Sequence, residues 1–343
     1  MGHGNQSSGK GVFEAVVLSN RRIGLTFYKL RLELSGAGAV AFSRFRPGQF
    51  AQLDATTAEL PPADEIPEEL ADAAQRQILL RRPFSFTDVS KHGDKTTAEL
   101  LYCVVGPATL RMTTLRPRSR VSIVGPLGSG FWLPEGKKKA FFVFGGMGTA
   151  PIQHLAKDMM EGELRSEIEI VAFAGAKTRW GLPFEKRADE MSEYLGFAIR
   201  EFARYGIESR IATDDGSAGY HGLVTDCFLD WLKENKVDAK SSVIYSCGPE
   251  PMLATVAKIA KDRGIDCQVS MERRMACGIG VCQSCAIECR VDGSNNTIYK
   301  MCCEDGPVFD AREVVFQPPS PKGPLRGHED TKVKKELATE GLE

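Results

Sequence analysis

The sequence has almost no excess charge of either sign. Its 343 residues include 44 Lys and Arg against 45 Asp and Glu, which gives a formal net charge of -1. Nucleic acids and anionic membrane surfaces attract proteins mainly through a basic excess. We therefore expect neither to be a partner of this chain.

Long hydrophobic runs are also lacking. Although 42% of the residues are hydrophobic, no apolar run approaches the roughly 18 residues that a transmembrane helix requires. The first residues, MGHGNQSSGKG, do not contain the apolar core of a signal peptide. The sequence predicts no membrane insertion and a reducing, cytoplasmic setting.

Cysteine, in contrast, is plentiful, and six of the ten cysteines fall between residues 274 and 312. The first three of these form a C-x4-C-x2-C arrangement: Cys277, Cys282 and Cys285. The adjacent pair Cys302 and Cys303 follows after a short insert. This spacing is typical of a plant-type iron–sulfur cluster.

Glycines in the same loop favour that interpretation. Gly278 and Gly280 can adopt positive φ, which would let the backbone turn its amides toward the sulfurs. A zinc site is one alternative, but zinc ribbons usually pair one C-x2-C with a second, and only one such pair fits here. Disulfides are another alternative, which the absence of a secretory segment disfavours.

Residues 12–135 contain short segments of alternating apolar and polar residues separated by turns. This pattern predicts a small antiparallel β-barrel. Residues 54–77 interrupt it with seven acidic residues against one basic. Pro67, followed by Glu68 and Glu69, indicates the first turn of a short helix. The insert is either a solvated surface excursion or an element that docks a partner.

Residues 138–269 show a different pattern, in which continuous apolar strands such as KKKAFFVFGG and SSVIYSCG alternate with helix-compatible stretches. Apolar residues between Phe184 and Phe202 recur at helical spacing, which predicts an amphipathic helix there. Buried strands separated by helices indicate a parallel sheet with helices on both faces. Residues 317–343 are rich in proline and charge, and we expect a flexible tail.

Three motifs could bind nucleotides. In R-P-F-S, residues 82–85, the arginine could bind a diphosphate and the aromatic ring could cover a flat heterocycle. GGMGTAP, residues 145–151, joins a strand to a helix, where glycines let phosphates approach the backbone. CGPEPM, residues 247–252, lies at the carboxyl end of another strand, where open α/β sheets bind ligands.

Taken in order, RPFS, GPLGSGF, GGMGTAP, TDDGSAGYHGLVTD, CGPEPM and the terminal cysteines with DGPVFDA resemble the ferredoxin reductase superfamily. Within it, the chain most resembles the iron–sulfur electron-transfer subunits of NAD-dependent dihydroorotate dehydrogenases, over about residues 12–316. The resemblance implies a multidomain β plus α/β fold. Its parts would be an FAD-binding barrel at 12–135, an NAD-binding domain at 138–269 and a [2Fe-2S] domain at 270–316.

The resemblance also implies site residues. FAD would be bound by three segments of the barrel: Arg82, Pro83, Phe84, Ser85, Leu101, Tyr102, Cys103, Ala108 and Thr109. NAD(H) would be bound by two loops of the second domain: Gly145, Gly146, Gly148, Thr149, Cys247, Gly248 and Pro249. The implied catalytic residues are Ser85, near the reactive edge of the flavin, and Cys247.

Three cluster ligands would be Cys277, Cys282 and Cys285. The fourth is a choice between Cys302 and Cys303, because successive side chains on an extended segment point to opposite faces. The family places a cysteine three residues before the Gly-Pro of its D-G-P-V-F segment, which implies Cys303.

The function implied is electron transfer between a partner's redox centre, the cluster, FAD and NAD(H). It would serve oxidation of dihydroorotate to orotate in pyrimidine biosynthesis, in a hetero-oligomer with a dihydroorotate dehydrogenase catalytic subunit. An alternative is the small subunit of a ferredoxin:NADP oxidoreductase or of a hydrogenase diaphorase, and another is a binding module without turnover. NADP also stays open as the nucleotide, because Lys177 and Arg179 follow a strand where a 2′-phosphate could lie.

Overall fold

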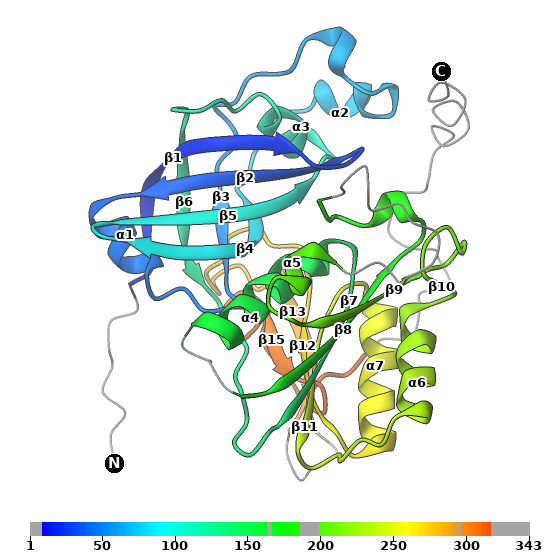
Figure 1. Ribbon diagram of the computed structural model, residues 1–343. Helices are drawn as coiled ribbons and strands as arrows, with labels where there is room; N and C mark the ends of the chain where they lie inside the picture. The colour runs from blue at the N-terminus through cyan, green and yellow to red at the C-terminus, as the bar shows by residue number, and fades with distance from the viewer. Residues whose placement is uncertain (1–8, 163–166, 186–198, 292–293, 295, 317–343) are drawn as a thin grey trace, which may run out of the picture.

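The computed structural model describes residues 9–162, 167–185, 199–291, 294 and 296–316. A β-barrel built from the N-terminal part packs against an α/β sheet built from the rest (Figure 1). The predicted tail at 317–343 lies outside the described residues. No helix in the described part of the chain has the length and apolar character needed to cross a membrane.

The barrel is closed and antiparallel, with strand order β1-β2-β5-β4-β3-β6. Its strands are β1 Gly11–Arg22, β2 Phe27–Leu34, β3 Phe50–Leu53, β4 Arg82–His92, β5 Lys95–Cys103 and β6 Arg120–Leu127. Alternate side chains of each strand point into the barrel and fill its interior. In β2 these are Leu30, Leu32 and Leu34, which are fully buried. Helices α1 Gly36–Phe42 and α3 Pro107–Met112 pack on it. The predicted barrel is confirmed.

The acidic insert forms short helical turns: η1 Ala63–Glu65, η2 Glu68–Leu70 and α2 Ala71–Ala74. Leu70 and Ala74 are buried in the barrel core, and Arg111 of α3 donates a hydrogen bond to the Ala74 carbonyl at 3.1 Å. The carboxylates of Glu68, Glu69 and Asp72 stay exposed. The insert is therefore attached to the barrel through an apolar side and presents a charged outer side.

The second sheet has seven strands in the order β10-β9-β8-β7-β11-β12-β15. Six of them are parallel: β7 Lys139–Gly145, β8 Glu169–Ala176, β9 Glu208–Thr213, β10 Tyr220–His221, β11 Ser242–Cys247 and β12 Asp266–Ser270. The connecting helical elements are η3 Gly146–Gly148, α4 Thr149–Glu161, η4 Arg179–Gly181, α5 Arg200–Ala203, α6 Val224–Glu234 and α7 Glu250–Arg263. The predicted parallel sheet is confirmed.

Helices cover both faces of this sheet, as expected. In β7, Phe141 and Val143 share a core with α6 and α7, whereas Phe142 and Phe144 share one with α4 and α5. Alternation along a buried strand produces this division. Figure 1 shows α6 and α7 on the side of the sheet opposite to α4 and α5.

The helix predicted between Phe184 and Phe202 is described only at its ends, because residues 186–198 lie outside the described part. Both end residues are buried. The ring of Phe144 lies 6.4 Å from that of Phe184 and 5.5 Å from that of Phe202, measured between centroids. These two residues therefore pack against β7, the strand that leads into the glycine-rich loop at residues 145–149.

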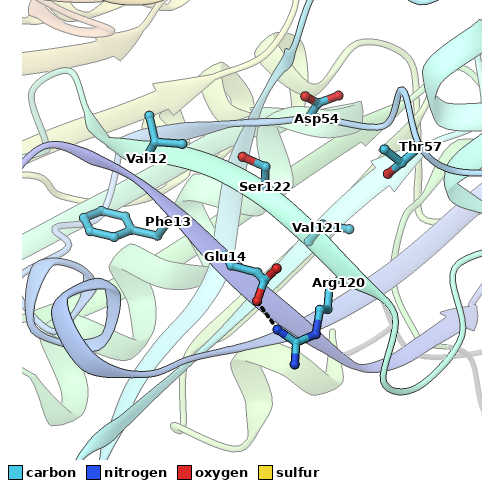
Figure 2. A pocket seen from close by; sticks show the side chains of 8 residues that line it. All are labelled: Val12, Phe13, Glu14, Asp54, Thr57, Arg120, Val121 and Ser122. Carbon is cyan, nitrogen blue, oxygen red and sulfur yellow. Dashed lines mark hydrogen bonds and ion pairs between the residues drawn. The ribbon is translucent and has the colours of Figure 1, made fainter.

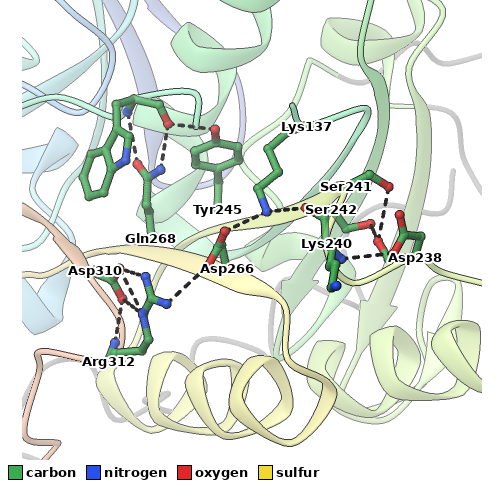
Figure 3. A network of polar contacts seen from close by, with 11 residues as sticks. Lys137, Asp238, Lys240, Ser241, Ser242, Tyr245, Asp266, Gln268, Asp310 and Arg312 are labelled. Atoms are coloured by element: carbon green, nitrogen blue, oxygen red, sulfur yellow. Dashed lines mark hydrogen bonds and ion pairs between the residues drawn. The ribbon is translucent and has the colours of Figure 1, made fainter. Parts of the chain in front are cut away.

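The C-terminal region combines a hairpin with an addition to the sheet. Strands β13 Ala286–Arg290 and β14 Thr297–Met301 form an antiparallel pair, and β15 Val308–Asp310 pairs antiparallel with β12. Figure 3 shows polar contacts that support this junction: Asp266 of β12 pairs with Lys137 at 2.7 Å and with Arg312 at 3.4 Å. The region predicted to hold a cluster thus shares a core with the nucleotide sheet.

Helix α4 connects the barrel to the sheet. Lys157 forms an ion pair with Asp88 of β4. Three residues before it in the same helix, buried His154 stacks on Phe45 of the barrel at 5.9 Å between centroids. Lys29 of the barrel, also buried, lies 3.7 Å from Glu201 of α5. These contacts join the barrel to the helices that cover the sheet.

Candidate functional site

The loop between β12 and β13 contains three of the predicted cluster cysteines. Gly278 and Gly280 have φ values of 70° and 86°, as only glycine adopts readily. The amides of Ile279 and Cys282 donate to Cys277 Sγ at 3.5 and 3.3 Å. The amide of Gly280 donates to Cys303 Sγ at 3.0 Å. The loop therefore directs backbone N–H groups at sulfur, which suits a bound iron–sulfur cluster.

The adjacent cysteines at the end of β14 point to different places. Cys303 Sγ faces the loop through its bond from Gly280, and both Cys285 and Cys277 act on its pKa. Cys302 Sγ instead donates to the Met271 carbonyl at 3.2 Å in the buried core. Of the two, Cys303 has its sulfur among the other predicted ligands.

The thiols of two proposed ligands have pKa values shifted in opposite directions. Burial, and then the neighbouring Cys285, raises the pKa of Cys303 to about 12. Hydrogen bonding, chiefly from Ser284, lowers the pKa of the exposed Cys282 thiol to about 6. Cysteines bind metal as thiolates. Because four such anions would repel one another, a cationic iron centre would stabilise them together.

The cluster assignment depends on cysteine number and spacing, because four thiolates are the usual ligands of a two-iron cluster. Within the described residues, His, Cys, Asp and Glu side chains form no group of three or more already arranged to hold a metal ion. All ten cysteines are present as free thiols in the described part of the chain.

The residues predicted for FAD do not all face one side of the barrel. Leu101 packs with Met147 and Ala150 of the nucleotide domain. Tyr102 is fully buried inside the barrel, where its ring stacks on Tyr28 at 5.3 Å between centroids. Its hydroxyl donates to Asn20 Oδ1 at 3.1 Å, and burial raises its pKa. Tyr102 can therefore contact a ligand outside the barrel only through its backbone.

The R-P-F-S motif opens β4 beside β3. Arg82 donates to the Leu80 carbonyl at 2.7 Å, Pro83 and Ser85 pair with Gln52 and Phe50 in register, and the ring of Phe84 meets that of Tyr102 edge-on. The motif is half-buried rather than fully exposed. It therefore lies in the strand pair that borders both the barrel core and the C-terminal region.

The predicted phosphate turn is used partly by the protein itself. Thr109 Oγ1 accepts hydrogen bonds from the amides of Val105 and Gly106 at 2.9 and 3.2 Å. Ala108 is buried in the barrel core. On the outer side, Cys103 Sγ contacts Thr26 Oγ1 at 3.3 Å, and burial raises the pKa of this thiol.

The two predicted nucleotide loops come together. Strands β7 and β11 are parallel neighbours, so their carboxyl ends meet at the same edge of the sheet. A Cβ on Gly148 would overlap the carbonyl of Cys247 and lie 2.8 Å from Gly248 N. A Cβ on Gly145 would lie 3.3 Å from Met252 Sδ and 3.6 Å from Pro249 Cδ. The loops containing Gly145, Gly146, Gly148 and Thr149 and containing Cys247, Gly248 and Pro249 form one surface.

Cys247 is 5% exposed, and burial raises the pKa of its thiol to about 12. It is therefore protonated at neutral pH and does not act as a thiolate nucleophile. Next to it in the fold, Glu250 at the start of α7 binds Arg273 through two contacts of 3.0 Å. No sequence motif indicated this bidentate pair. It anchors the segment that leads into residues 277–285, here called the cluster loop.

Two hollows lie beside the barrel. The larger, of about 410 Å³, is bordered by β1 and β6, and the ion pair between Glu14 and Arg120 crosses it (Figure 2). Its lining includes no residue predicted to bind a cofactor. The smaller, of about 290 Å³, lies between the barrel and the cluster loop and is lined by Gln52, Arg81 and Cys277 among others. Sequence patterns did not single out Gln52 or Arg81.

Comparison with known proteins agrees with this arrangement. Residues 272–315 match the profile of the iron-sulfur cluster binding domain of dihydroorotate dehydrogenase B, and residues 142–258 match an oxidoreductase NAD-binding domain. The electron transfer subunit of dihydroorotate dehydrogenase B (NAD(+)) from Caldanaerobacter subterraneus is 33% identical over 303 residues, covering 88% of this chain and 98% of that protein. The chain belongs to this family.

A second dihydroorotate dehydrogenase B electron transfer subunit, from Bacillus caldolyticus, is also 33% identical, over 88% of this chain and 97% of its own length. Among solved structures, an NADH-dependent reduced ferredoxin-NADP oxidoreductase has a TM-score of 0.63 at 23% identity, covering 88% of this chain and 90% of that one. The cytochrome b5 reductase domain of Ulva prolifera nitrate reductase gives 0.53 at 14% identity, covering 74% and 94%. These structures support the ferredoxin reductase-like fold.

Proposed function

We propose that this chain is the electron-transfer subunit of an NAD-dependent dihydroorotate dehydrogenase. It would carry electrons between a catalytic partner subunit and NAD(H), in support of dihydroorotate oxidation to orotate. The observation that carries the proposal is membership of the dihydroorotate dehydrogenase B electron transfer family, over 88% of this chain. In the same chain the loop directs amides at the predicted ligand sulfurs. The partner makes the assembly a hetero-oligomer.

The proposed cluster ligands are Cys277, Cys282, Cys285 and Cys303. The chain's own part is to hold the four sulfurs and to place amide donors beside them, which stabilises added negative charge on a cluster. Cys302 supports the site from the core through its bond to Met271. Free thiols throughout the chain suit the reducing cytoplasm that we propose as its location.

For the flavin we propose the outer surface of β4 and β5. Pro83 and Ser85, on the same side of the strand pair as Gln52 and Phe50, would hold FAD together with Leu101 and Cys103, and Tyr102 would contribute its backbone. Arg82 would reach the flavin from the start of β4 and Phe84 would support it from the barrel side, while the turn at Ala108 and Thr109 would offer backbone donors. FAD, when bound, exchanges electron pairs with a nicotinamide and single electrons with an iron–sulfur centre. The contact of Leu101 with Ala150 brings this surface against the nucleotide loop.

For NAD(H) we propose the joined loops at the ends of β7 and β11. Close packing of Gly148 on Cys247 fixes the loop shape, and the neutral Cys247 thiol offers an uncharged surface to a nicotinamide ring. Hydride transfer requires no general base, so the protein's task there is orientation and exclusion of water. Ser85 and Cys247 would border the reacting atoms.

Reconstitution with a catalytic subunit tests this function. We expect purified protein to show flavin absorbance and, after reduction, the paramagnetic signal of a two-iron cluster. Adding a dihydroorotate dehydrogenase catalytic subunit should give dihydroorotate-dependent reduction of NAD that neither protein supports alone. Cofactor-loaded protein that couples instead to ferredoxin or to a hydrogenase would overturn the proposed partner, and protein that binds no flavin would overturn the mechanism.

A further inference from the structure

Strand β3 has two different faces. Ala51 and Leu53 belong to the barrel core, whereas Phe50 belongs to the core shared by the sheet and the cluster region. Because side chains alternate along a strand, Gln52 lies on the same side as Phe50. The Gln52 side chain therefore leaves the barrel toward the C-terminal region, yet it is only 2% exposed.

The cluster loop covers this glutamine. A Cβ on Gly278 would lie 2.5 Å from Gln52 Cδ, so the glutamine amide occupies the space beside that glycine. Gln52 also lines the hollow of about 290 Å³ together with Ala276 and Cys277. Gly278 follows Cys277 directly in the chain, so the amide is next to a proposed cluster ligand.

One end of the amide is left without an acceptor. Gln52 Nε2 is buried, and within the described residues nothing accepts a hydrogen bond from it. A buried donor without a partner costs about 1–3 kcal/mol. Such a group, aimed at the loop that would hold the cluster, indicates an acceptor that belongs to the bound state.

A second buried glutamine shows how such an amide is normally satisfied. Gln268 is also 2% exposed, but its Nε2 donates to the Trp132 carbonyl at 2.7 Å and its Oε1 accepts from the Trp132 amide at 3.1 Å (Figure 3). The two residues have equal burial and the same side chain. They differ in that Gln52 faces the cluster loop.

We propose that Gln52 is a positioning residue for the cluster, whose side-chain N–H donates a hydrogen bond to a sulfur atom at the Cys277 end. This inference rests on the two-iron cluster of the proposed function. A donor directed at sulfur stabilises the reduced and more negative state, so it raises the reduction potential. Gln52 would in this way tie β3, which pairs with the R-P-F-S motif, to the electron-accepting centre.

The test is the cluster's midpoint potential, measured by redox titration followed by paramagnetic resonance. Gln52→Leu removes the donor while keeping most of the volume. We expect the equilibrium to shift toward the oxidised cluster by about threefold to tenfold, where a tenfold change corresponds to about 59 mV for one electron. Gln52→Glu, which replaces the donor by a carboxylate, should shift the potential further in the same direction.

Gln268→Leu is the matched control, because it removes an equally buried amide that lies away from the loop. It should lower the melting temperature and leave the potential unchanged. In wild-type protein labelled with 15N in glutamine side chains, pulsed resonance should detect a coupling that Gln52→Leu loses and Gln268→Leu keeps. An intact signal with the same potential and coupling in Gln52→Leu overturns this inference alone, whereas wild-type protein without any two-iron signal overturns the proposed function.

Discussion

The cluster loop, residues 277–285, and the nucleotide loop, residues 145–149, both depend on glycine, but for different physical reasons. Gly280 has a φ of 86°, and this conformation turns its amide toward Cys303. Gly148 has a φ of -59°, which any residue adopts, but its missing side chain lets the Cys247 carbonyl approach. In one loop glycine sets the direction of donors, and in the other it allows two strand ends to meet.

The sharpest test of the cluster loop is its fourth cysteine. Cys303→Ser should abolish the cluster, because it removes the sulfur that receives the Gly280 amide. Iron content, visible absorbance and the paramagnetic signal of the reduced protein measure the loss. NADH-dependent reduction of the flavin should persist, because the nucleotide loop is untouched.

Cys302→Ser is the control for that experiment. A serine hydroxyl can still donate to the Met271 carbonyl that Cys302 contacts. We expect a normal cluster content and a loss of roughly 1 kcal/mol in the free energy of unfolding, because a small apolar side chain becomes polar in the core. If Cys302→Ser lost the cluster and Cys303→Ser kept it, Cys302 rather than Cys303 would be the fourth ligand.

Gly148→Ala should break the nucleotide loop while sparing the cluster. Its Cβ would overlap the backbone of Cys247, so one of the two loops must move. A displacement of about 1 Å near a reaction site can cost on the order of 100-fold in rate. We expect flavin reduction by NADH to fall by at least about tenfold, with an unchanged paramagnetic signal after dithionite.

Gly136→Ala provides a comparison outside both loops. Gly136 has a φ of 77° and no atom within 4 Å of an added Cβ. Alanine there strains the backbone by about 1 kcal/mol without moving any neighbour. Equal loss of NADH oxidation in both variants would mean that general destabilisation, rather than the contact with Cys247, explains the effect.

The helix that starts at the nucleotide loop should also make the protein sensitive to acid. Burial lowers the pKa of His154 from 6.5 to about 4, against the opposing effect of Asp88. Between these values the unfolded chain binds a proton that the folded chain does not. Stability should therefore fall by about 1.4 kcal/mol per pH unit below about pH 6.5, and level off below about pH 4.

Urea unfolding between pH 7.5 and pH 5 measures this slope, and His154→Leu should reduce it. The residues that face His154 include Asp88, Lys157 and Phe45. Lys157 and Asp88 form their own ion pair, so a slope that is unchanged in His154→Leu would assign the acid sensitivity to that pair instead.

The sequence was informative where a pattern is local. Strand alternation predicts the barrel and the parallel sheet, and cysteine spacing predicts the loop that directs amides to sulfur. Alternation along β5 also accounts for Tyr102: because it lies between Leu101 and Cys103, its side chain must face the opposite side from both. In the same way, Leu70 and Ala74 stand at helical i, i+4 spacing, which explains the apolar side of the acidic insert.

Contacts between distant segments could not be predicted in this way. Strand β15 has only three residues, and its pairing with β12 depends on where the cluster region folds back. Gln52 is an ordinary polar residue in its strand until Gly278 covers it. The bidentate pair between Glu250 and Arg273 also joins two separate segments. Such contacts are set by packing between parts of the chain and leave no periodic signal.

The smallest expected effect concerns the backbone of the cluster loop. It should show whether the unusual conformation of Gln283 helps to hold the cluster or is only a source of strain. Gln283, between Cys282 and Cys285, has a φ of 56°, an unusual value for a residue with a side chain. Gln283→Gly should relieve about 1 kcal/mol of backbone strain but enlarge the freedom of the unbound loop. We expect a slightly more stable protein that loses iron faster to a chelator, because the sulfurs are less firmly positioned. Arg118→Gly is the control, because Arg118 has a φ of 75° in a barrel turn that holds no proposed ligand. It should increase stability without increasing the rate at which the protein loses iron. Equal rates of iron loss in the two variants would show that the unusual backbone of the loop does not help to hold the cluster.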